Sequence, residues 1–375
     1  MLTRRASTLT QEPQLYASRT DMSKFFSKKF DALTPYVPGE QPKDTNYIKL
    51  NTNESPYPPS PSVLKAVSAE VGKLQLYSDP ECSILRDKAA EVFGVDRERI
   101  IMTNGSDEVL NFAFMAFSDE THPIVFADIT YGFYSVFAEI NRVPYEIIPL
   151  RDDFSINYRD YVGINKNIVL ANPNAPTGLA LPLSEIEEIV KTNPDNVVII
   201  DEAYVDFGAE SAIRLTDKYD NLLVCGTFSK SRSMAGARLG FGIGNAALIR
   251  DLNTIKYSTN PYNVNRMTAV AGYAAMCENK YYMDNCKKII ETRRYLTDAL
   301  ISLGFECTDS RTNFVFAKHP KLDGGQLYLA LKRMGILVRH FDKEKISQYN
   351  RITVGTREQT DELLKAIKTI LEECK

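Results

Sequence analysis

The chain of 375 residues contains no tryptophan, only three histidines, and six cysteines without a short paired spacing. Paired cysteines mark zinc sites and secreted disulfide frameworks, so their absence argues against both and predicts reduced thiols. Three scattered histidines also disfavour a histidine-rich metal centre, and we expect no bound metal. The cysteines are Cys82, Cys225, Cys277, Cys286, Cys307 and Cys374.

Long apolar runs and basic runs are missing as well. No stretch approaches the roughly 20 apolar residues that a membrane-spanning helix needs. The net charge is −3 and no basic segment is interleaved with aromatic residues, which argues against a nucleic-acid surface. We therefore expect neither membrane nor nucleic acid among the partners.

The first 21 residues are polar and irregular, with Arg4, Arg5 and Arg19, and they lack the apolar core of a secretion signal. We expect a disordered tail over residues 1–30 and a cytoplasmic protein. Because a more regular stretch begins at Met22, we expect Met22 to be the native start.

Short apolar runs alternate with helical patterns from about residue 61 to 256. Most of these runs lack polar alternation, as in strands covered on both faces. Strand–helix alternation predicts an α/β domain with a mostly parallel sheet and helices on both faces. Expected strands are Ile100–Thr103, Ile124–Ala127, Ile147–Leu150, Ile168–Ala171, Val197–Ile200, Leu222–Cys225 and Leu239–Ile243, with helices over Glu108–Phe117 and Ser184–Lys191 among those between them.

The pattern changes after residue 261. Two long helical stretches, 263–278 and 281–303, precede short strands and a terminal helix over about 358–373. A length above the roughly 100–200 residues of one domain also favours two domains. We expect an N-terminal arm over 31–65 that joins the small domain, a large domain over 66–260, and a small α+β domain over 261–375. The short strands are expected at Phe314–Ala317, Ile336–Val338 and Ile352–Val354.

The segment Thr227-Phe228-Ser229-Lys230, with Arg238 eight residues after Lys230, suggests a pyridoxal-phosphate site. The lysine amine can condense with the aldehyde of this cofactor, while serine and arginine side chains can hold its phosphate. A solvated surface lysine is the alternative reading. Other segments that follow expected strands in the same region make the cofactor reading the better one.

Two such segments lie upstream. Asn104-Gly105-Ser106-Asp107 follows strand 100–103 and opens a helix, where free backbone N–H groups bind anions. A simple N-cap is the alternative. Tyr131 follows strand 124–127, where its ring can stack on a flat heteroaromatic ligand, although a core tyrosine is the alternative.

Two more segments follow buried strands. The turn Asn172–Gly178, which contains Asn174, follows strand 168–171 at the edge where α/β sheets bind ligands; an ordinary connector is the alternative. Asp201 and Tyr204 follow strand 197–200. A carboxylate there can pair with a protonated pyridine nitrogen and keep the ring electron-poor, and Tyr204 can donate to the ring hydroxyl oxygen. A helix-capping aspartate is the alternative for Asp201.

From about Asp31 onward the chain resembles the fold-type I pyridoxal-phosphate aminotransferases, and among them the histidinol-phosphate aminotransferases most closely. Besides the segments above, the resemblance rests on Thr34–Pro42, Leu50-Asn51-Thr52-Asn53-Glu54-Ser55-Pro56, Tyr77-Ser78-Asp79-Pro80 and Arg351-Ile352-Thr353-Val354-Gly355. It implies a pyridoxal 5'-phosphate cofactor, a small-molecule amino donor, a 2-oxo acid acceptor such as 2-oxoglutarate, and a homodimer with shared active sites.

The resemblance also implies roles for individual residues. Lys230 would carry the Schiff base and act as the general base on the substrate Cα proton. Asp201 and Tyr204 would bond the ring nitrogen and hydroxyl, and Tyr131 would stack on the ring. The phosphate end would be lined by Ser106, Asp107, Thr227, Ser229 and Arg238, with Tyr77 of the neighbouring subunit. The substrate would meet Asn53, Arg339, Arg351 and Tyr36 from the partner.

One position departs from the family pattern. The family usually has asparagine directly before Pro-Thr-Gly, and this chain has Ala175. Asn174 or Asn172 is the expected substitute. Threonine-phosphate decarboxylases and aromatic amino-acid aminotransferases share the scaffold and remain alternatives, and a cofactor-binding regulator is the non-enzyme alternative.

Overall fold

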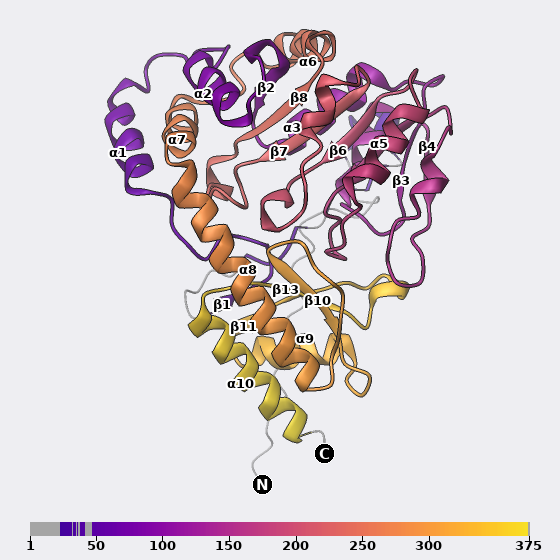
Figure 1. Cartoon of the computed structure of the whole chain (residues 1–375), viewed down its shortest axis with the longest axis vertical. Coiled ribbons are helices and arrows are strands. Elements are labelled where there is room, and N and C mark those ends of the chain that lie inside the picture. The colour runs from indigo at the N-terminus through magenta and orange to yellow at the C-terminus, as the bar shows by residue number, and fades with distance from the viewer. Residues whose placement is uncertain (1–22, 32, 35, 37, 42–46, 374–375) are drawn as a thin grey trace.

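A seven-stranded sheet forms the centre of the larger lobe, which is the upper part of Figure 1. The computed structural model describes residues 23–31, 33–34, 36, 38–41 and 47–373. The strand order is β2-β8-β7-β6-β5-β3-β4, and only β8 runs antiparallel to its neighbours. The strands are β2 (Ile100–Thr103), β3 (Ile124–Ala127), β4 (Tyr145–Ile148), β5 (Asn167–Ala171), β6 (Val198–Asp201), β7 (Leu222–Thr227) and β8 (Gly240–Gly244). The predicted α/β class with a mostly parallel sheet is confirmed, and every predicted strand of this sheet lies within two residues of an observed one.

Helices cover both faces of this sheet, which explains why its central strands are apolar throughout. Ile199 faces a core that includes α3 (Ser106–Phe117), α4 (Phe133–Asn141) and α6 (Ala246–Thr259). Its neighbours Val198 and Ile200 face the opposite core, built on α5 (Leu183–Thr192). Successive side chains of a strand point to opposite faces, so two covered faces require apolar residues at every position.

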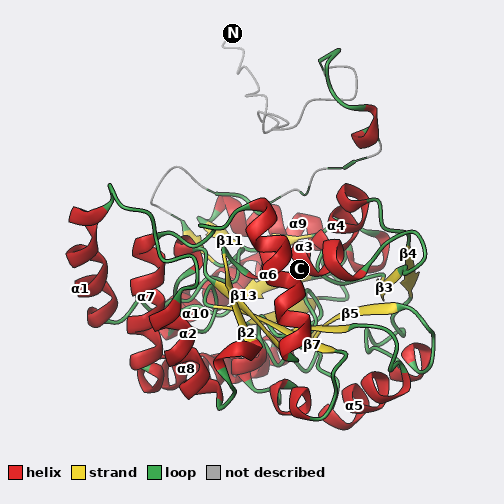
Figure 2. Cartoon of the chain, turned by 90° about the horizontal axis from the view of Figure 1, so that it is seen from above, coloured by secondary structure: helices red, strands yellow, loops and turns green. Residues whose placement is uncertain are grey.

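The smaller lobe is built on a separate sheet of four strands, which is antiparallel and has the strand order β12-β13-β10-β9. Long helix α8 (Asn279–Ser302) extends from the larger lobe and packs against this sheet with α10 (Arg357–Glu373), as Figures 1 and 2 show. The N-terminal strand β1 (Ile48–Lys49) pairs with β11 (Ile336–Leu337) and so ties the arm to this lobe. The other elements are β9 (Glu306–Cys307), β10 (Phe314–Lys318), α9 (Gly324–Arg333), β12 (Arg339–His340) and β13 (Asn350–Thr353).

Helix α7 (Arg266–Cys277) packs with the larger lobe. It contacts α1 (Pro61–Glu70) and α2 (Ser83–Phe93), and its Ala271 and Ala275 share a core with β2 and β8. The expected domain boundary at residue 260 stays a prediction, but this packing favours a later boundary, near the start of α8. Of the expected tail over 1–30, residues 1–22 lie outside the described residues, as does the expected start at Met22, whereas Lys28–Phe30 form a short 3-10 helix.

Gly240 of β8 lets the start of α3 approach the sheet. A Cβ at Gly240 would stand 2.3 Å from the Ser106 backbone nitrogen and 2.4 Å from the Gly105 carbonyl carbon. Both atoms belong to the backbone and cannot rotate away. The absent side chain at Gly240 therefore fixes where the N-terminus of α3 lies.

Replacing Gly240 with alanine should lower the free energy of unfolding by about 1–3 kcal/mol, the usual cost of overpacking a core. Urea unfolding followed by circular dichroism would measure it. Gly236→Ala is the matched control, because nothing lies within 4 Å of the Cβ it would add. Equal stability of the two variants would contradict the close contact.

Candidate active site

A cavity of about 650 Å³ lies at the carboxyl ends of the parallel strands, and the smaller lobe contributes part of its wall. Parallel strands end at one edge of a sheet, so the segments after β2, β3, β5, β6 and β7 meet there. Every site residue expected from the sequence lines this cavity except Asn174 and Tyr77. The expected residues that line it are Tyr36, Asn53, Ser106, Asp107, Tyr131, Asp201, Tyr204, Thr227, Ser229, Lys230, Arg238, Arg339 and Arg351.

One end of the cavity is built to hold an anion. Gly105 has φ +82°, and a Cβ there would stand 2.5 Å from the Arg238 guanidinium, so the missing side chain lets this guanidinium lie against the start of α3. Arg238 Nη2 lies 3.0 Å from Asp107 Oδ2, and its Nη1 donates to Ser229 Oγ at 3.5 Å. Backbone N–H groups at the start of α3 add to this positive end.

Asp201 lies buried at the end of β6, where the cavity wall is formed by the sheet. Its Oδ2 accepts a hydrogen bond from the Tyr134 hydroxyl at 2.9 Å, and its Oδ1 accepts one from the Ala203 N–H at 3.2 Å. Burial raises the pKa of Asp201 to about 6. A buried carboxylate without a cationic partner among the described residues fits a ligand that brings a positive charge, such as a protonated ring nitrogen.

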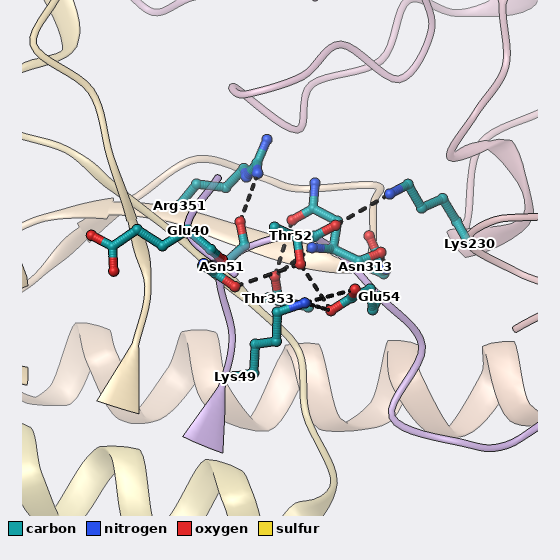
Figure 3. Close-up of polar contacts among 10 residues, drawn as sticks. Glu40, Lys49, Asn51, Thr52, Glu54, Lys230, Asn313, Arg351 and Thr353 are labelled. Carbon is teal, nitrogen blue, oxygen red and sulfur yellow. Dashed lines mark hydrogen bonds and ion pairs between the residues drawn. The ribbon is translucent and has the colours of Figure 1, made fainter. Parts of the chain in front are cut away.

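Lys230 follows β7 and points toward the chain segment Asn51–Glu54 (Figure 3). Its Nζ donates to the Thr52 carbonyl at 3.2 Å. Burial lowers the pKa of Lys230 to about 8, and the Arg351 guanidinium is the next largest cause. The Arg238 guanidinium also lowers the pKa of Lys230, but it contributes less than Arg351. A lysine with this pKa is neutral far more often at pH 7 than an exposed lysine.

Arg351 and Arg339 lie directly opposite each other on β13 and β12. Arg351 Nη2 donates to the Asn51 carbonyl at 3.0 Å (Figure 3). Its Nε is buried without a hydrogen-bond partner among the described residues. An unsatisfied buried donor is costly, so this guanidinium fits an anionic ligand in the cavity.

Tyr204 is held in place by Asn53, which donates from Nδ2 to the Tyr204 hydroxyl at 2.9 Å. Asn53 is in turn fixed by Thr353, whose hydroxyl donates to Asn53 Oδ1 at 3.0 Å. Asn53 has φ +55°, a left-handed conformation that asparagine tolerates better than most residues. The segment after β1 thus connects Tyr204 of the larger lobe to β13 of the smaller lobe.

Neither asparagine of the turn Asn172–Gly178 reaches the cavity, which corrects the expectation for Asn174. Asn174 Nδ2 donates to the Ile129 carbonyl at 2.9 Å, and its Oδ1 accepts from the Thr130 hydroxyl at 2.8 Å. Asn172 bonds the backbone of Leu181 through both ends of its amide. Ala175 lines the cavity in their place.

One aromatic residue, Tyr36, lies elsewhere than expected, and a second, Tyr77, does not line the cavity of its own chain. Tyr36 was expected from the partner, yet it lines the cavity of its own chain, with its ring 4.4 Å from that of Phe133. Tyr77 lies on the surface, 78% exposed, where it stacks on Tyr262 at 4.5 Å. The exposed position of Tyr77 leaves its reach into a neighbouring subunit as a prediction.

Sequence reasoning missed Tyr134 and Glu139, both on α4. Tyr134 holds Asp201, and Glu139 lines the cavity. A tyrosine three residues after Tyr131 was visible, but helix α4 turns it inward, which no local motif signals.

Among the described residues, no group of three or more histidine, cysteine, aspartate or glutamate side chains forms a metal site.

Comparison with known proteins identifies the family. Residues 45–367 match the family model "Aminotransferase class I and II". A histidinol-phosphate aminotransferase from Brachyspira hyodysenteriae is 51% identical over 94% of this chain and 100% of its own length.

Two solved structures share the fold. The first is a histidinol-phosphate aminotransferase from Sinorhizobium meliloti in complex with pyridoxal-5'-phosphate. The match covers 94% of this chain and 100% of the other chain, with TM-score 0.82 and 22% sequence identity. The second is an L-threonine-O-3-phosphate decarboxylase from Porphyromonas gingivalis. The match covers 87% of this chain and 99% of the other chain, with TM-score 0.76 and 22% sequence identity. At this identity the two structures support the fold alone, whereas the family model and the curated relative support the resemblance seen in the sequence. The chain therefore belongs to the class I and II aminotransferases, as its histidinol-phosphate aminotransferase relative does.

Proposed function

We propose that this protein is a pyridoxal-phosphate-dependent histidinol-phosphate aminotransferase, which moves the amino group of L-histidinol phosphate to 2-oxoglutarate during histidine biosynthesis. The products are imidazole acetol phosphate and glutamate. The observation that carries the proposal is the pair of facing arginines, Arg339 and Arg351, in the same cavity as the buried amine of Lys230. The 51% identity to a histidinol-phosphate aminotransferase over nearly the whole chain supports the donor.

The cavity residues fit pyridoxal 5'-phosphate at each of its functional groups. Lys230 would hold the aldehyde carbon, Asp201 the ring nitrogen, and Ser106, Ser229 and Arg238 the phosphate. When bound, this cofactor supplies an electron-poor ring that accepts the electron pair left when a substrate C–H bond breaks. The buried carboxylate of Asp201, which has no cationic partner among the described residues, and the close approach of the Arg238 guanidinium to Gly105 support this placement.

Lys230 acts as the general base once its amine is free. Its Nζ would accept and hold the proton released from the substrate Cα. An amine must be unprotonated to accept a proton, and burial together with Arg351 favours the neutral amine. The Thr52 carbonyl, which accepts from Nζ, orients the amine.

Arg339 and Arg351 suit both substrates of the proposed reaction. The donor ends in a phosphate and the acceptor carries two carboxylates, and a planar guanidinium pairs with either anion through two parallel hydrogen bonds. Arg351 has a buried N–H without a partner among the described residues, so binding an anion would satisfy it.

The ring hydroxyl of the cofactor would be held by Tyr204 alone. The family asparagine is replaced by Ala175, and Asn172 and Asn174 are both bonded elsewhere. Asn53 donates to the Tyr204 oxygen, which supports a Tyr204 O–H that donates into the cavity.

We also propose a homodimer, with each Tyr77 reaching the cofactor phosphate of the neighbouring subunit. The chain on either side of Tyr77, from α1 to the start of α2, exposes apolar side chains: Leu64, Leu74, Leu76 and Ile84 are each more than half exposed. Apolar patches of this kind mark protein–protein contacts.

A cytoplasmic location is proposed as well. The described cysteines are free thiols, as expected in a reducing compartment. No helix in the described part of the chain is long and apolar enough to cross a membrane.

A panel of amino donors tests the proposed function. Histidinol phosphate should transfer its amino group to 2-oxoglutarate with a kcat/KM at least tenfold above those of phenylalanine and tyrosine. Threonine phosphate should release no carbon dioxide. In Arg339→Gln the KM for histidinol phosphate should rise about tenfold, because a charged hydrogen bond contributes about 1.5–3 kcal/mol.

The other outcomes of the panel identify the alternatives. Carbon dioxide from threonine phosphate would identify a decarboxylase, and a preference for phenylalanine or tyrosine an aromatic aminotransferase. Cofactor binding without any amino-group transfer would identify a regulator. An unaltered KM in Arg339→Gln would remove Arg339 from the substrate site.

Sedimentation of the cofactor-loaded protein tests the dimer. We expect a single species of two chains. Tyr77→Ala should bind the cofactor more weakly, because it lacks the hydroxyl that would reach the cofactor phosphate of the neighbouring subunit. Tyr273→Ala serves as a control, since Tyr273 is also exposed but lies outside the expected contact with the cofactor. A fully active species of one chain would contradict the shared site.

A further inference from the structure

Helix α4 presents one face to the cavity. Ser135, Val136 and Glu139 line it, together with Gly132 just before the helix. Residues spaced three and four apart lie on the same side of a helix, so this strip is a continuous part of the wall. Glu139 lies partly buried at its far end, two turns of helix beyond Tyr131. None of the roles described so far uses Glu139.

Among the described residues that line the cavity, the acidic ones are Asp107, Asp201 and Glu139. Asp107 is paired with Arg238 and accepts from the Tyr131 hydroxyl at 2.8 Å. Asp201 accepts from Tyr134 and lies fully buried at the end of β6. These two carboxylates belong to the cofactor end.

Glu139 is bonded more weakly than the other two. Its Oε2 accepts from the Thr34 N–H at 3.3 Å, and its Oε1 accepts from the Tyr145 hydroxyl at 3.5 Å. Both distances are at the long end for hydrogen bonds. A carboxylate has room for about four hydrogen bonds, so Glu139 keeps accepting capacity for a ligand in the cavity.

The two substrates of the proposed reaction differ at the end remote from the arginines. The donor has an imidazole ring, which carries an N–H and becomes cationic near pH 6.5 if it titrates as histidine does. The acceptor has a second carboxylate. The cationic side chains that line the cavity, which are Lys230, Arg238, Arg339, Lys343 and Arg351, suit anions and offer nothing to an imidazole N–H.

We infer that Glu139 recognises the imidazole ring of the amino donor by accepting a hydrogen bond from its N–H. This inference rests on the proposed function and adds the residue that distinguishes the donor from other phosphorylated amines. A carboxylate binds an N–H more strongly than a neutral acceptor does, and most strongly when the ring is protonated. The same charge disfavours the remote carboxylate of the acceptor.

The experiment compares wild type with Glu139→Gln, using the cofactor-loaded enzyme. The donors are histidinol phosphate and 2-aminopropyl phosphate, which has the same amine and phosphate but no ring. The variant should raise the KM for histidinol phosphate about tenfold, leave the KM for 2-aminopropyl phosphate unchanged, and leave that for 2-oxoglutarate unchanged or lower.

The pH dependence separates recognition from a structural role. In wild type, the KM for histidinol phosphate divided by that for 2-aminopropyl phosphate should rise from pH 6 to pH 8, as the ring loses its proton. Changes at Lys230 affect both donors and cancel in this ratio. In Glu139→Gln the ratio should become nearly independent of pH.

Glu146→Gln is the matched control. It removes the same charge from β4, where Glu146 pairs with Lys166 outside the cavity, and it should behave as wild type. An equal rise in KM for both donors in Glu139→Gln would assign Glu139 to holding Thr34 and would overturn the inference. The inference would also be overturned if the ratio of the two KM values in Glu139→Gln were the same as in wild type. A wild type that does not transfer the amino group of histidinol phosphate would instead overturn the proposed function.

Discussion

The site depends on a lysine amine that is buried next to a guanidinium. Neither cation forms an ion pair with a carboxylate in the described part of the chain: Lys230 Nζ donates to the Thr52 carbonyl and Arg351 Nη2 donates to the Asn51 carbonyl. Backbone oxygens satisfy part of each group without cancelling its charge. The arrangement favours the neutral amine and keeps the arginine ready for an anion, and these are the two properties that the proposed reaction needs.

Both lobes contribute residues to this site. The sheet edge of the larger lobe supplies Asp201 and Lys230, whereas β12 and β13 of the smaller lobe supply the facing arginines. The segment after β1 joins them, since its Asn53 contacts both Tyr204 and Thr353. A shift of one lobe against the other would therefore change the distance between the amine and the anion-binding side chains. This short segment therefore joins the lysine side of the cavity to the arginine side.

Much of this architecture follows from local sequence. Apolar runs without polar alternation identified the strands of the large sheet, because both of its faces are covered. The parallel arrangement then places the residues after each strand at one edge, and this predicted that Ser106, Asp201 and Lys230 would line one cavity. The family resemblance supplied Arg339 and Arg351, whose register opposite each other no spacing reveals.

The errors concern orientation, which sequence spacing does not determine. Asn174 stands in a turn beside the cavity, but its amide bonds the backbone of Ile129 and so faces away. Tyr36 lies on an arm whose path depends on packing against Phe133. Glu139 lies on helix α4, and only the tertiary structure shows that this side of the helix lines the site. In each case a long-range contact decides where the side chain points.

The most direct test of this account is the pKa of Lys230 in the protein freed of cofactor. The rate at which an amine-reactive reagent modifies Lys230 can be followed against pH by peptide mass spectrometry. We expect a pKa of about 8 in wild type. It should rise in Arg351→Gln, because removing a neighbouring positive charge favours the protonated amine, and rise less in Arg238→Gln. A wild-type value near 10.5, that of an ordinary lysine, would contradict the account.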